Sequence, residues 1–259
     1  MQIRIVGCGA MGSAIAEALK GAGIEISVYD KHEERADALA RAIGASKAPS
    51  AWSDLFPADC VLLAVKPQDF ESAAKESQEF AGGLVASILT GITTDRLKTT
   101  FPQCAVLRMM PNLAVRYGDG VVALAEDPTL GKHKNEIEDI FSPLGLLRWL
   151  PESLFDAVTA LTGSGPAFVF AIIEAMVDAS IALGFSPDTG YELIKQMIGG
   201  SLTMLYESPD SPGDLRRQVC SPAGTTIAGI RALEANGARH AIIEAFIAAK
   251  DRAVELGKK

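Results

Sequence analysis

The hydrophobic pattern of the first 150 residues alternates between short apolar runs and longer amphipathic stretches. The short runs, rich in β-branched residues, predict strands at 2–6, 25–29, 60–65, 84–87, 104–108 and 120–124. The amphipathic stretches predict helices at 11–22, 33–43, 68–80 and 94–100, and a last helix and strand are expected at 136–141 and 146–149. Strands that alternate with helices indicate an α/β fold with a doubly wound parallel sheet.

After Pro151 the alternation ends, and helical stretches run to Leu256. We therefore expect two domains, residues 1–150 with the sheet and residues 151–259 with helices only. Residues 157–173 form an uncharged run of 17, shorter than the roughly 20 apolar residues of a membrane span. An all-round apolar helix is better explained as buried. Burial against a second copy predicts a homodimer with an intertwined helical domain, and a purely intramolecular core is the alternative.

Composition narrows the class of protein. The 24 basic and 32 acidic residues give a net charge of −8 without any Lys/Arg-rich run, so we expect no nucleic-acid partner and no membrane. Strand residues begin at position 2, so the N-terminus does not resemble a signal peptide, and a cytoplasmic protein is expected. Four cysteines lie far apart, which predicts reduced thiols, and three scattered histidines predict no metal site.

A glycine motif, G-x-G-x-x-G, follows the first predicted strand and opens the first predicted helix. Strand, glycine turn and helix in this order are the dinucleotide-binding fingerprint. Gly7 allows the tight turn, Gly9 lets the backbone approach a pyrophosphate, and Gly12 lets helix and strand pack closely. The pyrophosphate would lie on the free N–H groups at the helix start. The alternative is the same strand–turn–helix unit without a ligand.

The residues after the second strand bear on the choice of dinucleotide. Asp30 lies 18 residues beyond Gly12, close to the spacing of the acid that binds the ribose. A carboxylate there accepts from a 2′-hydroxyl and repels a 2′-phosphate, which favours NAD(H). The adjacent Lys31 favours NADP(H) instead, because it could pair with that phosphate. We expect appreciable use of NADH, and leave NADP(H) and NAD(H) both open.

Three more segments follow predicted strands, at the edge of the sheet where ligands of parallel sheets collect. They are 64–67 after the third strand, Thr90 and Gly91 after the fourth, and 108–112 after the fifth. Lys66 and Asn112 are candidates for direct contact with the cofactor. The alternative for Pro67 and Pro111 is simple termination of a strand.

Two polar islands interrupt the helical region, at 162–166 and 221–226. Ser221 followed by a proline is a good helix start, and helix capping alone would account for the serine. Capping does not explain Gly224, Thr225 and Thr226, whose N–H groups and hydroxyls suit a carboxylate.

Neither island supplies an evident acid or base. The first has no lysine nearby, and the second has no His, Asp or Glu. An alcohol–ketone oxidoreductase needs a group that handles the hydroxyl proton, whereas a protonated cyclic imine needs mainly positioning. The sequence therefore favours C=N reduction. The alternatives are a β-hydroxyacid or 6-phosphogluconate-type dehydrogenase, and a nucleotide-binding dimer without activity.

Together, five motifs resemble the Δ1-pyrroline-5-carboxylate reductase family nearly end to end. They are GCGAMGSAI at 7–15, AVKPQ at 64–68, RMMPN at 108–112, GSGPAFVF at 163–170 and LRRQVCSPAGTTI at 215–227. The resemblance implies a Rossmann-like domain, a helical dimerisation domain, a dimer or larger homo-oligomer, and NAD(P)H-dependent reduction of 1-pyrroline-5-carboxylate to L-proline in proline biosynthesis. The active site would lie between the cofactor cleft and helices of both subunits.

The resemblance also implies roles for single residues. Cofactor contacts would come from Gly7, Cys8, Gly9, Ala10, Met11, Gly12, Ala64, Val65, Lys66 and Pro67. Spacing and strand ends add Asp30, Lys31, Thr90, Gly91 and Asn112 to the expected cofactor contacts. Substrate contacts would come from Ser164, Ser221, Gly224, Thr225 and Thr226, with the Thr226 hydroxyl beside the imine as the catalytic group. Two departures stand out. Phe168 replaces the usual tyrosine, and Ala223 replaces a glycine, which requires a negative φ at Ala223.

Overall fold

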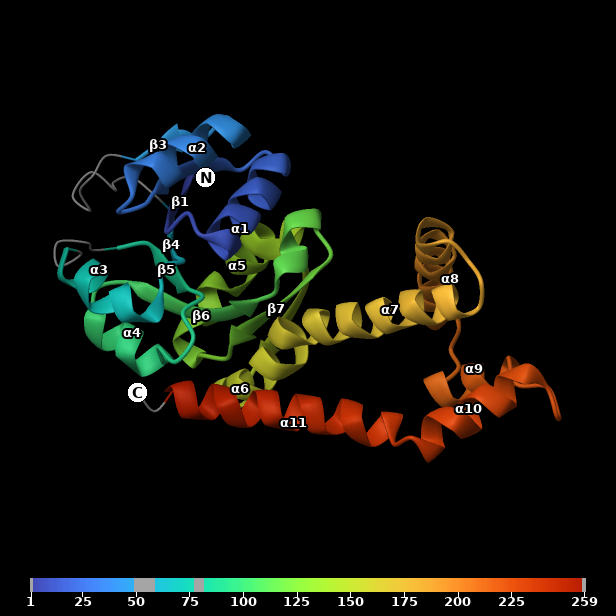
Figure 1. Cartoon of the computed structure of the whole chain (residues 1–259). Helices are drawn as coiled ribbons and strands as arrows, with labels where there is room; N and C mark the ends of the chain where they lie inside the picture. The colour runs from blue at the N-terminus through green and yellow to red at the C-terminus, as the bar shows by residue number, and fades with distance from the viewer. Residues whose placement is uncertain (1, 49–58, 77–81, 258–259) are drawn as a thin grey trace. The chain divides into compact units, whose positions relative to one another are not determined.

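The computed structural model describes residues 2–48, 59–76 and 82–257 (Figure 1). The chain forms two compact units, and each is described by itself. Unit 1 comprises Met1–Gly163 with Lys250–Lys259, and unit 2 comprises Ser164–Ala249. The predicted domain boundary between residues 150 and 151 stays a prediction, because compact units follow packing contacts and not the limits of independent folding.

Unit 1 is built on an eight-stranded sheet with the order β3-β2-β1-β4-β5-β6-β7-β8 among the described residues. The strands are β1 (Gln2–Val6), β2 (Glu25–Tyr29), β3 (Ser46–Lys47), β4 (Cys60–Leu63), β5 (Leu84–Ser87), β6 (Ala105–Pro111), β7 (Gly120–Ala125) and β8 (Gly145–Leu150). The sheet is mostly parallel, as predicted, but β6 and β7 pair antiparallel. Only the short turn Leu113–Tyr117 lies between them, and a parallel crossover needs a dozen residues or more.

Alternating side chains of strand β1 contribute to two of the three buried clusters formed by the described residues. Ile3 and Ile5 of β1 join one buried cluster, and Val6 joins the other. The first cluster includes residues of α1 (Ala10–Gly21), α2 (Glu33–Ile43) and α5 (Lys134–Phe141), and the second includes residues of α3 (Phe70–Glu76) and α4 (Thr94–Thr100). Helices therefore cover both faces of the sheet, which makes the fold doubly wound.

Unit 2 contains only helices among its described residues. They are α7 (Gly165–Ala182), α8 (Pro187–Glu207), α9 (Pro212–Gln218), α10 (Thr225–Ala235) and most of α11 (Ala238–Gly257), which ends in unit 1; α6 (Phe155–Val158) precedes them in unit 1. The stretch Glu152–Ala182 is long and apolar enough to cross a membrane by length and composition, and only 11% of its most apolar window is buried within the chain. Its apolar surface is thus uncovered in a single chain.

The observed limits equal the predicted ones for three strands and two helices. These are the strands at 2–6, 25–29 and 84–87 and the helices at 33–43 and 94–100. Strand β6 is three residues longer at its end than predicted, and strand β4 ends two residues earlier. The predicted helix at 68–80 is observed over Phe70–Glu76, and its last four residues lie outside the described part. Strand β3 was missed, because two exposed residues carry no hydrophobic pattern.

Candidate active site

The glycine loop between β1 and α1 forms a backbone cradle. Gly7 has φ +109°, and a Cβ there would lie 2.5 Å from the carbonyl oxygen of Ala64. A Cβ on Gly12 would lie 2.0 Å from the carbonyl oxygen of Gly7. Both positions therefore require glycine. Gly7 requires it by conformation and by contact, and Gly12 by contact alone. The predicted turn and the predicted close approach of helix to strand are confirmed.

Gly9 has a different role, because it is the N-cap of α1. Its backbone is extended, with φ −74° and ψ −174°, and no side chain caps the helix. A Cβ at Gly9 would meet no atom within 4 Å. The first N–H groups of α1 therefore have no side-chain cap, and the helix dipole favours an anion beside them.

A cleft adjoins this loop, beside the ends of β1, β2 and β4. Its described lining residues are Val6, Gly7, Gly9, Tyr29, Asp30, Lys31, His32, Arg35, Ala64, Val65, Lys66, Gln68, Asp69, Ser72 and Ala73. The cleft thus combines the glycine loop with the ends of three strands. Sequence analysis missed His32, Arg35, Gln68, Asp69 and Ser72. The nearness of His32 and Arg35 to Asp30 in the sequence was the available signal.

Asp30 is a buried acid that organises the cleft. Its Oδ2 accepts a hydrogen bond from the backbone N–H of Cys8 at 2.8 Å, and its Oδ1 accepts one from that of His32 at 2.9 Å. One carboxylate therefore ties the glycine loop to the segment after β2. Each oxygen retains a second lone pair for a further donor.

The thiol next to the loop is neutral. Burial of Cys8, with the negative charge of Asp30 as a second cause, raises the pKa of the thiol to about 12. Cys8 therefore has no thiolate with which to act as a nucleophile near neutral pH. Burial also raises the pKa of Cys60 to about 12 and, less strongly, that of Cys104.

The predicted residues at other strand ends lie in different surroundings. Ala64, Val65 and Lys66 line the cleft, and Pro67 follows as the first residue of a 3₁₀ turn. Gly91 has φ +80°, and a Cβ there would lie 3.4 Å from Cα of Gly257 at the end of α11.

Asn112 is buried, and its Oδ1 accepts from the N–H of Val121 at 3.2 Å, which ties the end of β6 to β7. Thr90, Gly91 and Asn112 are not among the described residues that line the cleft. Their cofactor roles stay predictions.

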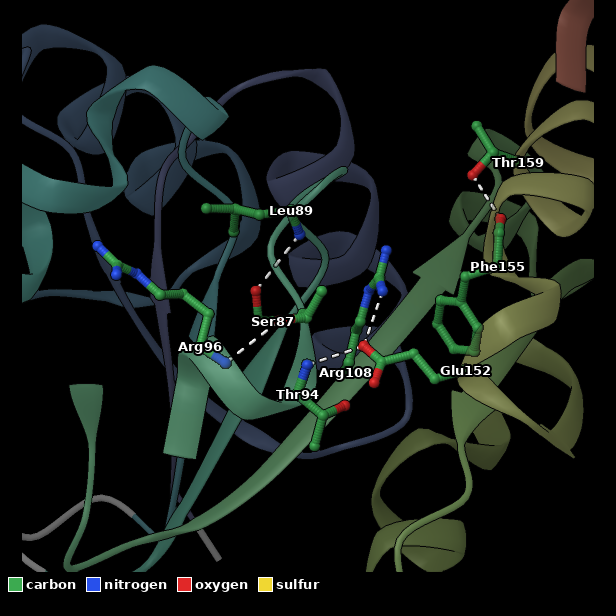
Figure 2. Close-up of polar contacts among 9 residues, drawn as sticks. Ser87, Leu89, Thr94, Arg96, Arg108, Glu152, Phe155 and Thr159 are labelled. Carbon is green, nitrogen blue, oxygen red and sulfur yellow. Dashed lines mark hydrogen bonds and ion pairs between the residues drawn. The ribbon is translucent and has the colours of Figure 1, made fainter. Parts of the chain in front are cut away.

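In the same unit, Arg108 of the RMMPN segment is a buried structural cation (Figure 2). Its Nη1 donates to Oε1 of Glu152 at 2.7 Å, and its guanidinium lies 4.8 Å from the ring centroid of Phe155. The same Oε1 accepts from the backbone N–H of Thr94 at 2.8 Å. These contacts join β6, the start of α4 and the segment that leads into α6.

The second polar island forms a turn and a helix start in unit 2. The N–H of Gly224 donates to the carbonyl oxygen of Ser221 at 3.1 Å, with Pro222 and Ala223 between them. Ala223 has φ +57°, so the expected negative φ is wrong. A proline followed by a positive φ is the arrangement of a type II turn, whose third position favours glycine.

Helix α10 begins at Thr225, with Gly224 as its N-cap. The expected N-cap at Ser221 is therefore wrong, because the Ser-Pro pair makes the preceding turn. Gly224 has φ −78° and ψ 177°, and no side chain caps the helix. A Cβ at Gly224 would lie 2.2 Å from Oγ of Ser221 and 3.2 Å from its carbonyl oxygen, so a larger residue would have to turn the Ser221 hydroxyl away. The N–H groups of the first turn are left for another acceptor.

The first polar island is part of a π-helical stretch, Thr159–Ser164, that leads into α7. Such wide turns occur often at functional sites. Ser164 lies at its end, while the hydroxyl of Thr162 donates back to the carbonyl oxygen of Val158 at 3.0 Å. Phe168 packs edge-on against Phe246 of α11 with ring centroids 5.1 Å apart. The aromatic ring at this position therefore has a packing role.

Comparison with known proteins decides the family. The family model described as pyrroline-5-carboxylate reductase dimerisation matches residues 152–256, and the one described as coenzyme F420-dependent NADP oxidoreductase matches residues 2–91. A pyrroline-5-carboxylate reductase of Synechocystis is 38% identical over 272 residues, covering 100% of this chain and 99% of that protein. This chain belongs to the pyrroline-5-carboxylate reductase family. Its members are NAD(P)-dependent oxidoreductases, and the matched helical region is a dimerisation domain, which makes the chain part of a homo-oligomer.

Solved structures of the reductase family share the fold. A pyrroline-5-carboxylate reductase from Coxiella burnetii matches with a TM-score of 0.88 and 31% identity, covering 98% of this chain and 97% of that one. A pyrroline carboxylate reductase from Plasmodium falciparum with NADP bound matches with a TM-score of 0.87 and 25% identity, covering 99% and 100%. The uncovered apolar stretch Glu152–Ala182 lies entirely within the dimerisation match.

Proposed function

We propose that the chain reduces 1-pyrroline-5-carboxylate to L-proline with NADPH or NADH, the last step of proline biosynthesis. The observation that carries this proposal is a pair of similar helix starts. Gly9 before α1 and Gly224 before α10 both have an extended backbone, and neither helix has a side-chain cap. Each start leaves N–H groups for an anion, and the proposed reactants supply two, a pyrophosphate and a carboxylate.

The start of α1 fits the dinucleotide. A Cβ built on Gly9 would have no atom within 4 Å, so the space beside Gly9 lets a pyrophosphate approach the backbone closely. Ala10, Met11 and Gly12 continue the helix, and Lys66 adds a positive charge to the same cleft. When bound, the reduced dinucleotide supplies a hydride.

The start of α10 fits the imino acid. The N–H groups of Thr225 and Thr226 and the dipole of an 11-residue helix attract the substrate carboxylate. We assign the Thr226 hydroxyl to a hydrogen bond with the ring nitrogen, and Ser164 and Ser221 to further substrate contacts. The carbon of the protonated C=N bond gains the hydride, the π electrons of that bond become the lone pair of the nitrogen, and the product is a neutral secondary amine.

The chemistry demands little proton transfer from the protein. A cyclic imine can arrive already protonated, so hydride addition alone completes the reduction. Residues 221–226 contain no His, Asp or Glu, in agreement with a site that orients the substrate and donates hydrogen bonds. A hydroxyacid dehydrogenase would require a base for the hydroxyl proton.

We further propose that both NADH and NADPH are used. The Asp30 carboxylate favours a ribose 2′-hydroxyl, whereas Lys31, His32 and Arg35 at the same cleft favour a 2′-phosphate. The solved structure from Plasmodium falciparum, which has NADP bound, supports the use of NADPH. The ratio of kcat/KM for NADPH to that for NADH tests this point, and a hundredfold preference for NADPH would contradict it.

The assembly we propose is a cytoplasmic homodimer with an intertwined helical domain, or a larger oligomer built from it, without a nucleic-acid or membrane partner. The uncovered apolar surface of Glu152–Ala182 supports it, because a single chain leaves most of that surface exposed. Light scattering of the purified chain in buffer without detergent tests the proposal. A soluble monomer, or a protein that needs detergent, would contradict it.

A spectrophotometric assay tests the activity. We expect the absorbance of NADPH and NADH at 340 nm to fall on addition of 1-pyrroline-5-carboxylate, with L-proline formed in equal amount. The oxidised dinucleotides with a panel of β-hydroxyacids test the alternative dehydrogenase. Turnover of a hydroxyacid without turnover of the imine would overturn the proposal. Binding of a dinucleotide with no reaction in either assay would support a binding protein without activity.

A further inference from the structure

An ion pair connects two sides of the dinucleotide cleft. Lys31 follows β2, and Asp69 lies in the 3₁₀ turn after β4. Lys31 Nζ lies 2.8 Å from Asp69 Oδ1, and both residues line the cleft. Strand β1 lies between β2 and β4 in the sheet. The pair therefore links the segments on either side of the strand that leads into the glycine loop.

The two carboxylates of the cleft differ in their partners. Asp30 is buried and accepts from two backbone N–H groups, which fix its position. Asp69 has a side chain 29% exposed, and its ion pair is with Lys31, whose side chain is 60% exposed. Lysine has a flexible stem and a compact charge, so it can exchange one anionic partner for another.

We propose that Asp69 is a residue that sets dinucleotide selectivity, by competing with a ribose 2′-phosphate for Lys31. The inference rests on the proposed dinucleotide site. The Asp69 carboxylate holds Lys31 when the ribose carries a 2′-hydroxyl. A 2′-phosphate has to displace that carboxylate and also experiences its negative charge. Asp69 thereby weakens binding of 2′-phosphorylated ligands and leaves binding of ligands without that phosphate unchanged.

A binding experiment with two adenosine fragments tests this role. Isothermal titration calorimetry at low salt measures Kd for adenosine 2′,5′-bisphosphate and for AMP, which differ by the 2′-phosphate. We expect Asp69→Asn to tighten the bisphosphate by about fivefold, the upper range for one exposed ion pair, with AMP unchanged. Asp69→Glu keeps the charge and should retain the wild-type ratio. Lys31→Gln should weaken the bisphosphate and leave AMP unchanged.

Asp139→Asn is the matched control, because it removes the same charge from an exposed position on α5 that does not line the described cleft. An unchanged ratio in Asp69→Asn would overturn the proposal, as would an equal change for both fragments or the same change in Asp139→Asn. The fragments react with no imine, so this result is independent of the reductase activity. A chain that binds them as expected and reduces no imine would refute the proposed function and support the role of Asp69.

Discussion

Glu152 Oε1 accepts two hydrogen bonds in unit 1, one from Arg108 Nη1 at 2.7 Å and one from the backbone N–H of Thr94 at 2.8 Å (Figure 2). Burial opposes ionisation of this carboxyl, but the two hydrogen bonds and the charge of Arg108 outweigh it and lower its pKa below the ordinary value. The Nε of Arg108 is buried with no partner among the described residues. The buried charge of Arg108 is therefore compensated by the carboxylate of Glu152.

Replacement of Glu152 by glutamine should lower the free energy of unfolding by about 1–2 kcal/mol at pH 7, since a charge-assisted hydrogen bond becomes a neutral one. The pH dependence gives a sharper test. Because the pKa is lower in the folded state, wild-type stabilisation by Glu152 is complete above about pH 4.5 and is lost as the pH falls through the lowered pKa.

Urea unfolding of wild type and Glu152→Gln between pH 7 and pH 3, at one protein concentration, measures both effects. The difference between the two curves should shrink as the pH falls below about 4.5. Glu126→Gln removes another glutamate, exposed after β7, and should run parallel to wild type. Curves for Glu152→Gln that stay parallel to wild type would show that this carboxylate does not titrate as described.

Ala223→Gly should stabilise the protein. An L-residue in the left-handed region costs about 1–2 kcal/mol, and a glycine pays about 0.5–1 kcal/mol in unfolded-state entropy, so the expected net gain is about 0.5–1 kcal/mol. Differential scanning calorimetry would detect it as a higher Tm. Ala228→Gly, inside α10 and without a positive φ, should lower Tm. A lower Tm for Ala223→Gly as well would contradict the observed φ of +57°.

Gly12→Ala and Gly21→Ala form a matched pair, in the first turn and at the end of α1. A Cβ at Gly12 would lie 2.0 Å from a backbone oxygen, while a Cβ at Gly21 would meet nothing within 4 Å. Backbone contacts are not relieved by a change of rotamer, so we expect Gly12→Ala to weaken dinucleotide binding at least about a hundredfold, a cost near 2.7 kcal/mol. Gly21→Ala should bind as wild type does. Titration with NADPH fluorescence measures both, and equal affinities would refute the described packing.

Thr226 can be tested by two substitutions. Thr226→Ala should reduce kcat by about tenfold to a hundredfold, because a hydrogen bond to a charged group contributes about 1.5–3 kcal/mol, with KM for the dinucleotide unchanged. Thr226→Ser keeps the hydroxyl and should retain most of kcat. Steady-state kinetics with saturating 1-pyrroline-5-carboxylate separates these effects. Wild-type turnover in both variants would show that the hydroxyl is not needed.

The sequence predicts the elements of the dinucleotide cleft well, because local patterns determine them. Helix α2 has the predicted limits, and Gly7 and Gly12 have the predicted roles. Pairing direction was harder to predict, since the antiparallel β6–β7 pair depends on the length of a short connection. A hydrophobic pattern alone does not determine whether two strands pair parallel or antiparallel.

Long-range contacts explain the other omissions. Lys31 and Asp69 are 38 residues apart, and Arg108 and Glu152 are 44 apart, so no sequence motif contains either pair. The conformation of Ala223 was expected from residue preference, which favours a negative φ for alanine. The turn from Ser221 to Gly224 overrides that preference.

The proposed reaction transfers a hydride from a nicotinamide to the carbon of a cyclic C=N bond. Incubation of the oligomer with NADPH deuterated at C4 of the nicotinamide and with 1-pyrroline-5-carboxylate tests it by mass spectrometry of the product. We expect L-proline with one deuterium at C5 when the deuterium occupies the face of the nicotinamide from which the hydride leaves. Proline without deuterium from either labelled face, or no proline at all, would contradict it.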